Sequence, residues 1–161
     1  MDAKDFMEKI IVFLDMDGVI ADFDGSLPTK PRGLYTNPPE MYLPGFFRNL
    51  KLIPGAKEGV EWLLKQEYID LYIASKPVIN DKGSSYCLTE KVDWIQEQFP
   101  TLAKKIILIC NKALLRGHVL IDDDKDRWKH SFQGHFIHFD TEHPHLSWLN
   151  VQEYFNGITI R

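Results

Sequence analysis

Two aspartates follow a short apolar run near the start of the chain. Residues 10–14 read Ile-Ile-Val-Phe-Leu, and Asp15 and Asp17 come directly after them, before Gly18. Acids two positions apart at a strand exit can turn one carboxylate and one backbone carbonyl toward a cation, while the second carboxylate faces a neighbouring group. This spacing predicts a site for a metal ion and for acid, base or nucleophilic chemistry. As N-capping acids before a helix, the pair would have no chemical role.

Three more polar signals each follow an apolar run. Ser75 follows residues 70–74 and offers a hydroxyl that can hold phosphate oxygens, together with the backbone amides there. Lys112 comes just beyond residues 105–109 and supplies a compact cation. Asp122 opens a run of three aspartates after residues 119–121 and can add hard oxygen ligands. A carboxylate attacks a phosphate only where their repulsion is neutralised, and Mg²⁺ held by the aspartates would neutralise it together with Lys112.

Hydrophobic periodicity predicts the elements that position these groups. Short apolar runs alternate with helical patterns, which is typical of a parallel sheet with both faces covered. We predict strands at residues 10–14, 70–74, 105–109, 119–121 and 136–139, and helices at 55–66, 88–98 and 147–155, the last with Ser147 as its cap. Ligands of such sheets bind at the carboxyl ends of the strands, where all four signals lie.

The stretch from residue 23 to residue 54 differs from the rest. It holds six of the nine prolines and several aromatic residues, among them Phe46 and Phe47. Loops of this length are usually binding loops or lids, so we predict a small cap inserted after the first strand. The whole chain, residues 1–161, is then one α/β domain: a three-layer, Rossmann-like, mostly parallel sheet with a cap at residues 23–54.

Composition excludes several classes of protein. The hydrophobic content of 44% and the charged content of 26% are typical of a globular domain, and the net charge of −4 disfavours binding to a nucleic acid polymer or an anionic membrane. Two cysteines, Cys87 and Cys110, are too few for a disulfide framework. We find no apolar run long enough to span a membrane and no secretion signal, so we expect a cytoplasmic protein. A homodimer is compatible with this sequence.

Longer strings of residues carry a family resemblance. The strings are DMDGVIADF at 15–23, PGA at 54–56, IASKP at 73–77, YC at 86–87 with EK at 90–91 and Trp94, and LIDD at 120–123. In kind and order they resemble the haloacid dehalogenase superfamily of aspartate-dependent phosphohydrolases, and within it the 5'(3')-deoxyribonucleotidase family. The resemblance covers most of the chain, from residue 10 to about residue 139.

This resemblance implies roles for individual residues. Asp15 would be the nucleophile, and Asp17 the general acid and base. Asp15, Asp17 (through its carbonyl) and Asp122 would hold Mg²⁺, with Asp123 behind them. Ser75 would bind the phosphate, and Lys112 would stabilise both Asp15 and the charge of the phosphoryl group. The implied substrate-binding residues are Phe23, Phe46, Phe47, Lys76 and Lys91.

The implied function is that of a magnesium-dependent phosphomonoesterase. It would hydrolyse (deoxy)nucleoside 5'-monophosphates through an aspartyl-phosphate intermediate. Lys76 stands where these nucleotidases tend to have a second small hydroxyl residue, so another small phosphomonoester stays open as the substrate. A phospho-accepting module similar to a response-regulator receiver also stays open, although its acceptor aspartate would follow a later strand. An EF-hand is excluded, because its fifth and sixth positions would be Val19 and Ile20.

Overall fold

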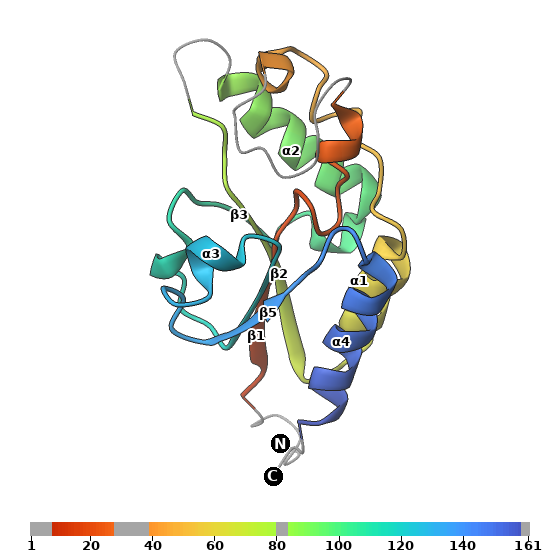
Figure 1. Ribbon diagram of the computed structural model, residues 1–161, viewed down its shortest axis with the longest axis vertical. Helices are drawn as coiled ribbons and strands as arrows, with labels where there is room; N and C mark the ends of the chain where they lie inside the picture. Colours follow the sequence, from red (N-terminus) through yellow and green to blue (C-terminus); the bar gives the residue numbers. More distant parts are fainter. Residues whose placement is uncertain (1–7, 28–38, 80–83, 159–161) are drawn as a thin grey trace.

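The computed structural model describes residues 8–27, 39–79 and 84–158, and a parallel sheet lies at its centre (Figure 1). All four strand pairings are parallel, and the strand order is β3-β2-β1-β4-β5. The strands are β1 (Ile10–Leu14), β2 (Ile69–Ser75), β3 (Ile106–Leu108), β4 (Val119–Asp122) and β5 (His135–His138). The predicted fold class, an α/β Rossmann-like sheet, is confirmed, and every predicted strand is present within two residues of its predicted ends.

The chain reverses its direction of travel across the sheet next to β1. From β1 it passes to β2 and then β3 on one side, and β4 and β5 then add to the other side. The reversal lies between β1 and β4, which carry Asp15 and Asp122 at their carboxyl ends. In open parallel sheets this is the place where loops diverge and leave room for a ligand.

The two faces of the sheet are covered unequally. Helices α1 (Ala56–Leu64) and α4 (Pro144–Asn156) lie side by side on one face, where their apolar side chains join the larger core with α2 (Ser84–Gln98) (Figure 1). The opposite face is covered by the short helix α3 (Lys125–Trp128) and by a turn at residues 112–115. Because strand side chains alternate, Val12 and Leu14 enter the larger core and Phe13 the smaller one.

Two details of the helices differ from the sequence predictions. The predicted cap at Ser147 is wrong: α4 already begins at Pro144, and the buried Ser147 hydroxyl accepts a bond of 2.8 Å from the backbone N–H of Asp140. Sequence periodicity also missed α3, which has four residues and therefore too few positions to show a period. The Asp124 side chain caps α3 by accepting a bond of 3.2 Å from the backbone N–H of Arg127.

The segment predicted as a cap leaves and rejoins the sheet at one place. The backbone N–H of Asp22 donates to the carbonyl of Lys51 at 2.8 Å, and that of Ile53 donates to the carbonyl of Ile20 at 2.9 Å. The described part contains short 3-10 turns at Asp24–Ser26 and Pro39–Tyr42, while residues 28–38 of the predicted cap lie outside the described residues. The two ends of the segment are therefore hydrogen-bonded to each other, beside Ala21, which is bridged to Asp17.

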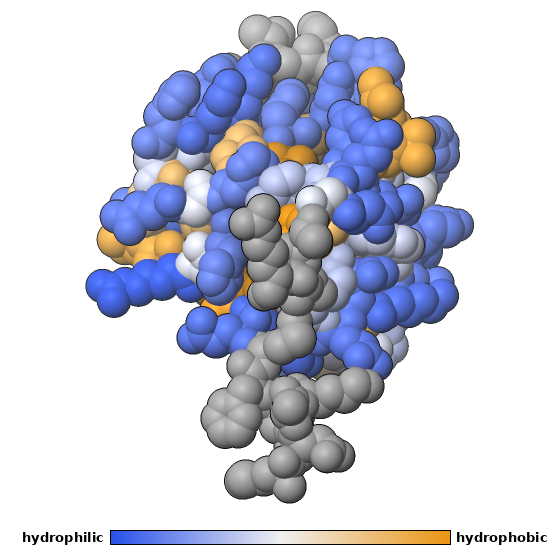
Figure 2. Space-filling model, turned by 90° about the horizontal axis from the view of Figure 1, so that it is seen from below, coloured by the Kyte–Doolittle hydropathy of each residue, from blue (hydrophilic) through white to orange (hydrophobic). Residues whose placement is uncertain are grey.

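The described residues contain no helix that is long and apolar enough to cross a membrane. Figure 2 shows the end of the molecule at which β1 begins and α4 ends, and there the described apolar residues form small separate areas among hydrophilic ones. The polar residues that follow β1, among them Asp15 and Asp17, come at the opposite end of this strand, on the side of α2.

Candidate active site

Four side chains predicted to carry chemistry meet at the carboxyl edge of the sheet. Asp15 directly follows β1, Ser75 ends β2 and Asp122 ends β4. Lys112 begins a 3-10 turn after β3. Parallel pairing puts these strand ends at one edge, and the backbone N–H of Asp15 extends the pairing by donating to the carbonyl of Ile121 at 2.9 Å. All four side chains are buried.

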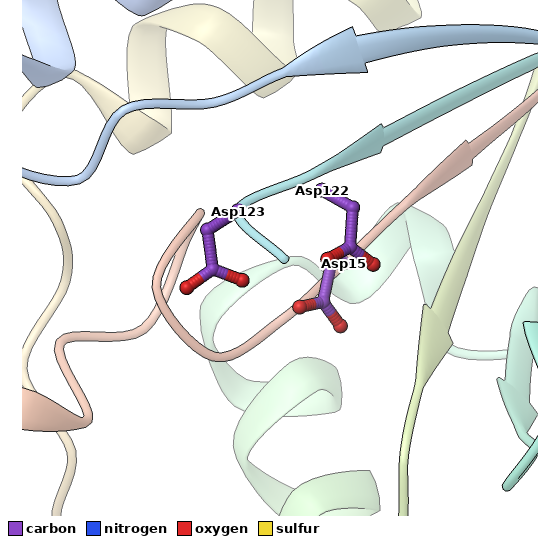
Figure 3. A group of neighbouring side chains, drawn as sticks. All are labelled: Asp15, Asp122 and Asp123. Carbon is purple, nitrogen blue, oxygen red and sulfur yellow. The ribbon is translucent and has the colours of Figure 1, made fainter. Parts of the chain in front are cut away.

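Three carboxylates form a cluster at this edge (Figure 3). One oxygen each of Asp15, Asp122 and Asp123 lies within 4.8 Å of the others. Asp15 and Asp122 come from neighbouring strands, and Asp123 comes from the loop that follows β4. Such hard oxygen atoms are the ligands that Mg²⁺ prefers. The cluster therefore has the donor set for a divalent cation.

Burial and repulsion between the carboxylates raise the pKa values of two of these acids. Burial, followed by repulsion from the Asp15 carboxylate, raises the pKa of Asp122 to about 7, although Lys112 opposes the shift. Burial and the charges of Asp15 and Asp122 raise the pKa of Asp123 well above its usual value. A cation bound among the three carboxylates would relieve this repulsion, so the residues fit a metal ion.

Lys112 joins two of the carboxylates. Its Nζ lies 2.6 Å from Oδ1 of Asp15 and 2.5 Å from Oδ2 of Asp122, and only 1% of the residue is exposed. Burial lowers the pKa of Lys112, but the two carboxylates outweigh burial and raise it above its usual value. The side chain is therefore a fixed positive charge beside the carboxylate of Asp15.

Asp17 faces a different lysine. Its Oδ2 accepts a bond of 2.5 Å from Nζ of Lys91 on α2, and its buried Oδ1 has no hydrogen-bond partner among the described residues. Burial raises the pKa of Asp17, the ion pair with Lys91 opposes that shift, and the Asp15 charge adds to it. A carboxyl group with a raised pKa and one unpartnered oxygen is suited to giving and taking a proton.

Lys91 lies at the centre of a second set of contacts. Its Nζ donates to Oδ2 of Asp17, to Oγ of Ser75 at 2.9 Å and to the carbonyl of Lys76 at 2.8 Å. An ammonium group has three N–H donors, so protein groups occupy all of them. The Lys76 side chain, by contrast, is exposed. Lys91 therefore fixes Asp17 and Ser75 relative to each other.

The three predicted aromatic contacts form one cluster beside this lysine. The ring centroid of Phe46 lies 5.3 Å from that of Phe23 and 5.1 Å from that of Phe47. Phe47 is 1% exposed, and its ring lies 4.8 Å from Nζ of Lys91, whereas Phe23 and Phe46 are only partly buried. Phe23 and Phe46 are thus the rings of this cluster that a ligand can reach.

Comparison with known proteins agrees with this geometry. Residues 26–153 match the family described as "5' nucleotidase, deoxy (Pyrimidine), cytosolic type C protein". That range spans most of the chain. The chain belongs to this family. The predicted family and its enzyme class, a phosphomonoester hydrolase, are therefore confirmed.

Individual relatives of the family come from a phage and from mammals. A Vibrio phage KVP40 protein assigned as a 5'(3')-deoxyribonucleotidase is 34% identical over 91% of this chain and 85% of its own length. The mitochondrial 5'(3')-deoxyribonucleotidase of Mus musculus is 28% identical over 87% of this chain, and that of Homo sapiens 30% identical over 71%. The chain spans 70% of the mouse protein and 62% of the human one.

The family match and the geometry cover different parts of the site. The matched range includes Ser75, Lys112 and Asp122, but it begins after Asp15 and Asp17. The case for the two aspartates therefore rests on their positions beside Lys112 and Lys91. Of the residues predicted to bind substrate, the structure brings Lys91 and Phe47 into buried contacts with the site and leaves the Lys76 side chain exposed.

Sequence reasoning gave too little weight to three residues of this site. Asp123 was expected behind the metal ligands, but one of its oxygens belongs to the acidic cluster itself. Thr141 was not singled out, although its hydroxyl donates a bond of 2.5 Å to the carbonyl of Gly18 and so holds the loop after Asp17. Glu90 entered only as part of a family string. A signal for it and for Lys91 exists, because both are charged residues on a helix side that also carries Trp94.

Proposed function

We propose that the protein is a magnesium-dependent phosphomonoesterase that hydrolyses (deoxy)nucleoside 5'-monophosphates through an aspartyl-phosphate on Asp15. The observation that carries this proposal is the Asp15 carboxylate, which is paired with the Lys112 ammonium group and lies in a cluster with Asp122 and Asp123. Membership in the 5'-nucleotidase family supports the same reaction.

We assign the metal to the acidic cluster. Asp15, Asp122 and Asp123 would hold Mg²⁺ through carboxylate oxygens, and the backbone carbonyl of Asp17 is a further proposed ligand. When bound, the ion supplies positive charge that lets a dianionic phosphate approach the carboxylates. Lys112 adds a second positive charge on the Asp15 side.

Asp15 is the proposed nucleophile. Lys112 holds its Oδ1, which leaves Oδ2 as the oxygen to attack phosphorus. A bond forms between this oxygen and phosphorus, and the bond from phosphorus to the ester oxygen of the substrate breaks. The leaving alkoxide takes a proton from the Asp17 carboxyl group, whose raised pKa favours the protonated form.

Asp17 acts again in the second step. Its carboxylate takes a proton from water, the water oxygen bonds to phosphorus, and the bond from phosphorus to Asp15 breaks. Free Asp15 and inorganic phosphate result. Lys91 binds Oδ2 of Asp17 and so keeps the carboxyl group in a fixed orientation for both proton transfers.

Ser75 is the proposed phosphate contact. Its oxygen accepts a bond from Lys91, so its own O–H hydrogen is directed elsewhere and can be donated to a phosphate oxygen. For the nucleobase, the partly exposed rings of Phe23 and Phe46 offer stacking surfaces, and the exposed Lys76 lies next to Ser75. The mammalian relatives, which are named 5'(3')-deoxyribonucleotidases, support a deoxynucleotide as substrate.

Phosphate release from a panel of esters tests the proposal. The panel holds ribo- and deoxyribonucleoside monophosphates, sugar phosphates and phosphoglycolate, each with and without Mg²⁺. We expect magnesium-dependent release that is fastest with a deoxynucleoside monophosphate, and none from Asp15→Asn, because an amide is not a nucleophile here. Faster release from another ester would identify that ester, and not a deoxynucleotide, as the preferred substrate. No release, with a persistent acyl phosphate on Asp15, would indicate a phospho-accepting switch. A homodimer stays a prediction for a sedimentation measurement.

A further inference from the structure

A carboxylate of α2 binds the backbone of the segment that carries the aromatic cluster. Oε1 of Glu90 accepts a bond of 2.5 Å from the N–H of Gly45, and Oε2 accepts bonds from the N–H groups of Phe47 at 3.1 Å and Arg48 at 3.3 Å. Glu90 is 8% exposed. A charge this well buried is costly unless it is bonded, and three backbone amides satisfy it.

The three amides surround Phe46. They belong to the residue before it and to the two residues after it, while the N–H of Phe46 donates to the carbonyl of Leu43. Backbone N–H groups of neighbouring residues that point to one side form a concave site for an anion, and three of the four N–H groups from residue 45 to residue 48 do so here. Here the protein fills that site with its own carboxylate, so the site is closed to phosphate and instead fixes the turn that carries Phe46.

Two further contacts from α2 continue this attachment. The indole N–H of Trp94 donates to the carbonyl of Leu50 at 2.8 Å in a buried position, and Arg48 pairs with Asp93 at 2.8 Å. The two partners of that ion pair are both substantially exposed, at 56% and 37% of their side chains, so the pair contributes little. Glu90 is therefore the charged group of α2 that matters most for residues 45–48.

We propose that Glu90 is a positioning residue for substrate selectivity: it holds residues 45–48 so that Phe46 is a fixed wall for the base of the nucleotide. This inference rests on the proposed function. It separates two tasks of neighbouring residues on α2, since Lys91 fixes Asp17 and Ser75 where the phosphate reacts, and Glu90 fixes the ring that the base meets. Loss of Glu90 then affects recognition of the base more than the chemistry.

The experiment compares a nucleotide with a sugar phosphate that lacks the base. Values of kcat and KM are measured for deoxythymidine 5'-monophosphate and for deoxyribose 5-phosphate with the wild-type protein, Glu90→Gln and Asp93→Asn. Glu90→Gln keeps the shape of the side chain but replaces one acceptor oxygen by an N–H₂ group that faces backbone N–H groups. Asp93→Asn makes the same change of charge three residues along α2 and is the matched control.

We expect Glu90→Gln to raise KM for the nucleotide about tenfold, the effect of losing the stacking of the base on a positioned aromatic ring. We expect kcat/KM for deoxyribose 5-phosphate to stay within about twofold, and Asp93→Asn to change both substrates by no more than that. An equal loss on both substrates, or no loss on either, overturns the proposal.

Amide hydrogen exchange gives a second reading that needs neither turnover nor a stable variant. In the wild-type protein the amides of Gly45, Phe47 and Arg48 should be protected from exchange, because they donate to Glu90. Fast exchange at these amides overturns the attachment. If the wild-type protein releases phosphate from neither substrate, the proposed function fails, and the exchange measurement still decides whether Glu90 holds this turn.

Discussion

Lys91 Nζ lies 2.5 Å from Oδ2 of Asp17, and the side chain of this lysine is 1% exposed. The two residues are 74 positions apart in the chain, on α2 and in the loop after β1. The same ammonium group also binds Ser75 at the end of β2. One buried charge thus sets the relative positions of the groups proposed to transfer the proton and to bind the phosphate.

Replacement of Lys91 tests this arrangement. We expect Lys91→Met to lower the free energy of unfolding by about 2 kcal/mol, because it leaves the partly buried carboxylate of Asp17 without its partner. We expect kcat to fall by about 100-fold, since a mispositioned polar group at a reacting centre costs that much. Urea unfolding and phosphate release measure the two effects. Lys76→Met is the control, because the Lys76 side chain is exposed. The free energy of unfolding of this variant should differ from that of the wild-type protein by no more than about 0.5 kcal/mol.

A double variant separates the ion pair from other effects of the Lys91 change. Adding Asp17→Asn to Lys91→Met removes the unpaired charge, so part of the lost stability should return. If the two changes instead add, the pair is not what holds this region together.

Gly18 is expected to accept no side chain. Its φ is +81°, and a Cβ atom there would lie 2.3 Å from Oδ2 of Asp123. Gly18→Ala should therefore displace the Asp123 carboxylate and weaken Mg²⁺ binding by about tenfold or more, which titration calorimetry measures. Gly45→Ala is the matched control, because its φ of +88° gives similar backbone strain away from the cluster. Equal Mg²⁺ affinity in Gly18→Ala and the wild-type protein would contradict the assignment of Asp123 as a ligand.

The stability of the metal-free protein should fall as the pH rises from about 4 to about 7. The pKa of Asp122 is raised to about 7 in the folded protein, against 3.8 as the ordinary value. The folded state therefore binds this proton more tightly than the unfolded state, and its contribution to stability is lost as the pH rises toward the folded-state pKa. Thermal unfolding in the presence of a chelator measures the trend. Asp122→Asn should flatten it, and saturating Mg²⁺ should offset it. An unchanged slope in Asp122→Asn would assign the effect to another group.

Close packing between α1 and α4 gives a prediction outside the site. A Cβ atom at Gly59 would lie 2.3 Å from Cε3 of Trp148, so Gly59→Ala should destabilise the protein by about 2 kcal/mol through overpacking, despite the better helix propensity of alanine. Gly157→Ala, where the nearest atoms are 3.4 and 3.5 Å away, should be nearly neutral. Chemical denaturation of the two variants compares them, and similar losses in both would argue against the packing explanation.

The strands and the acids at their ends were predictable from the sequence for a simple reason. Apolar runs in a parallel sheet are nearly continuous, and the residues that follow them share one edge. Asp15, Ser75 and Asp122 could therefore be placed together before any contact was known, and the structure does place them at that edge. Their catalytic roles stay predictions.

Contacts made across long stretches of chain could not be predicted in the same way. The pairing of Lys91 with Asp17 and of Glu90 with Gly45 depends on how α2 lies over the loops, which no local pattern encodes. The burial of Phe47 has the same origin, since its ring packs under Lys91 and not toward the surface. The start of α4 was misplaced because Ser147 resembles a cap in sequence while its hydroxyl binds Asp140.

The two ends of the inserted segment are hydrogen-bonded to each other, and this bears on replacing the segment with that of a relative. The inserted segment leaves the domain at Asp22 and returns at Lys51. A direct backbone hydrogen bond between these two residues fixes both ends of the segment. The segment can be lengthened or shortened between these positions without changing the course of β1, provided that residues 45–50 keep their contacts with α2. Transplanting a relative's segment between these two positions should then change which ester is hydrolysed fastest, and it should leave Asp17 and Ser75 in place where the contact of Phe47 with Lys91 is kept.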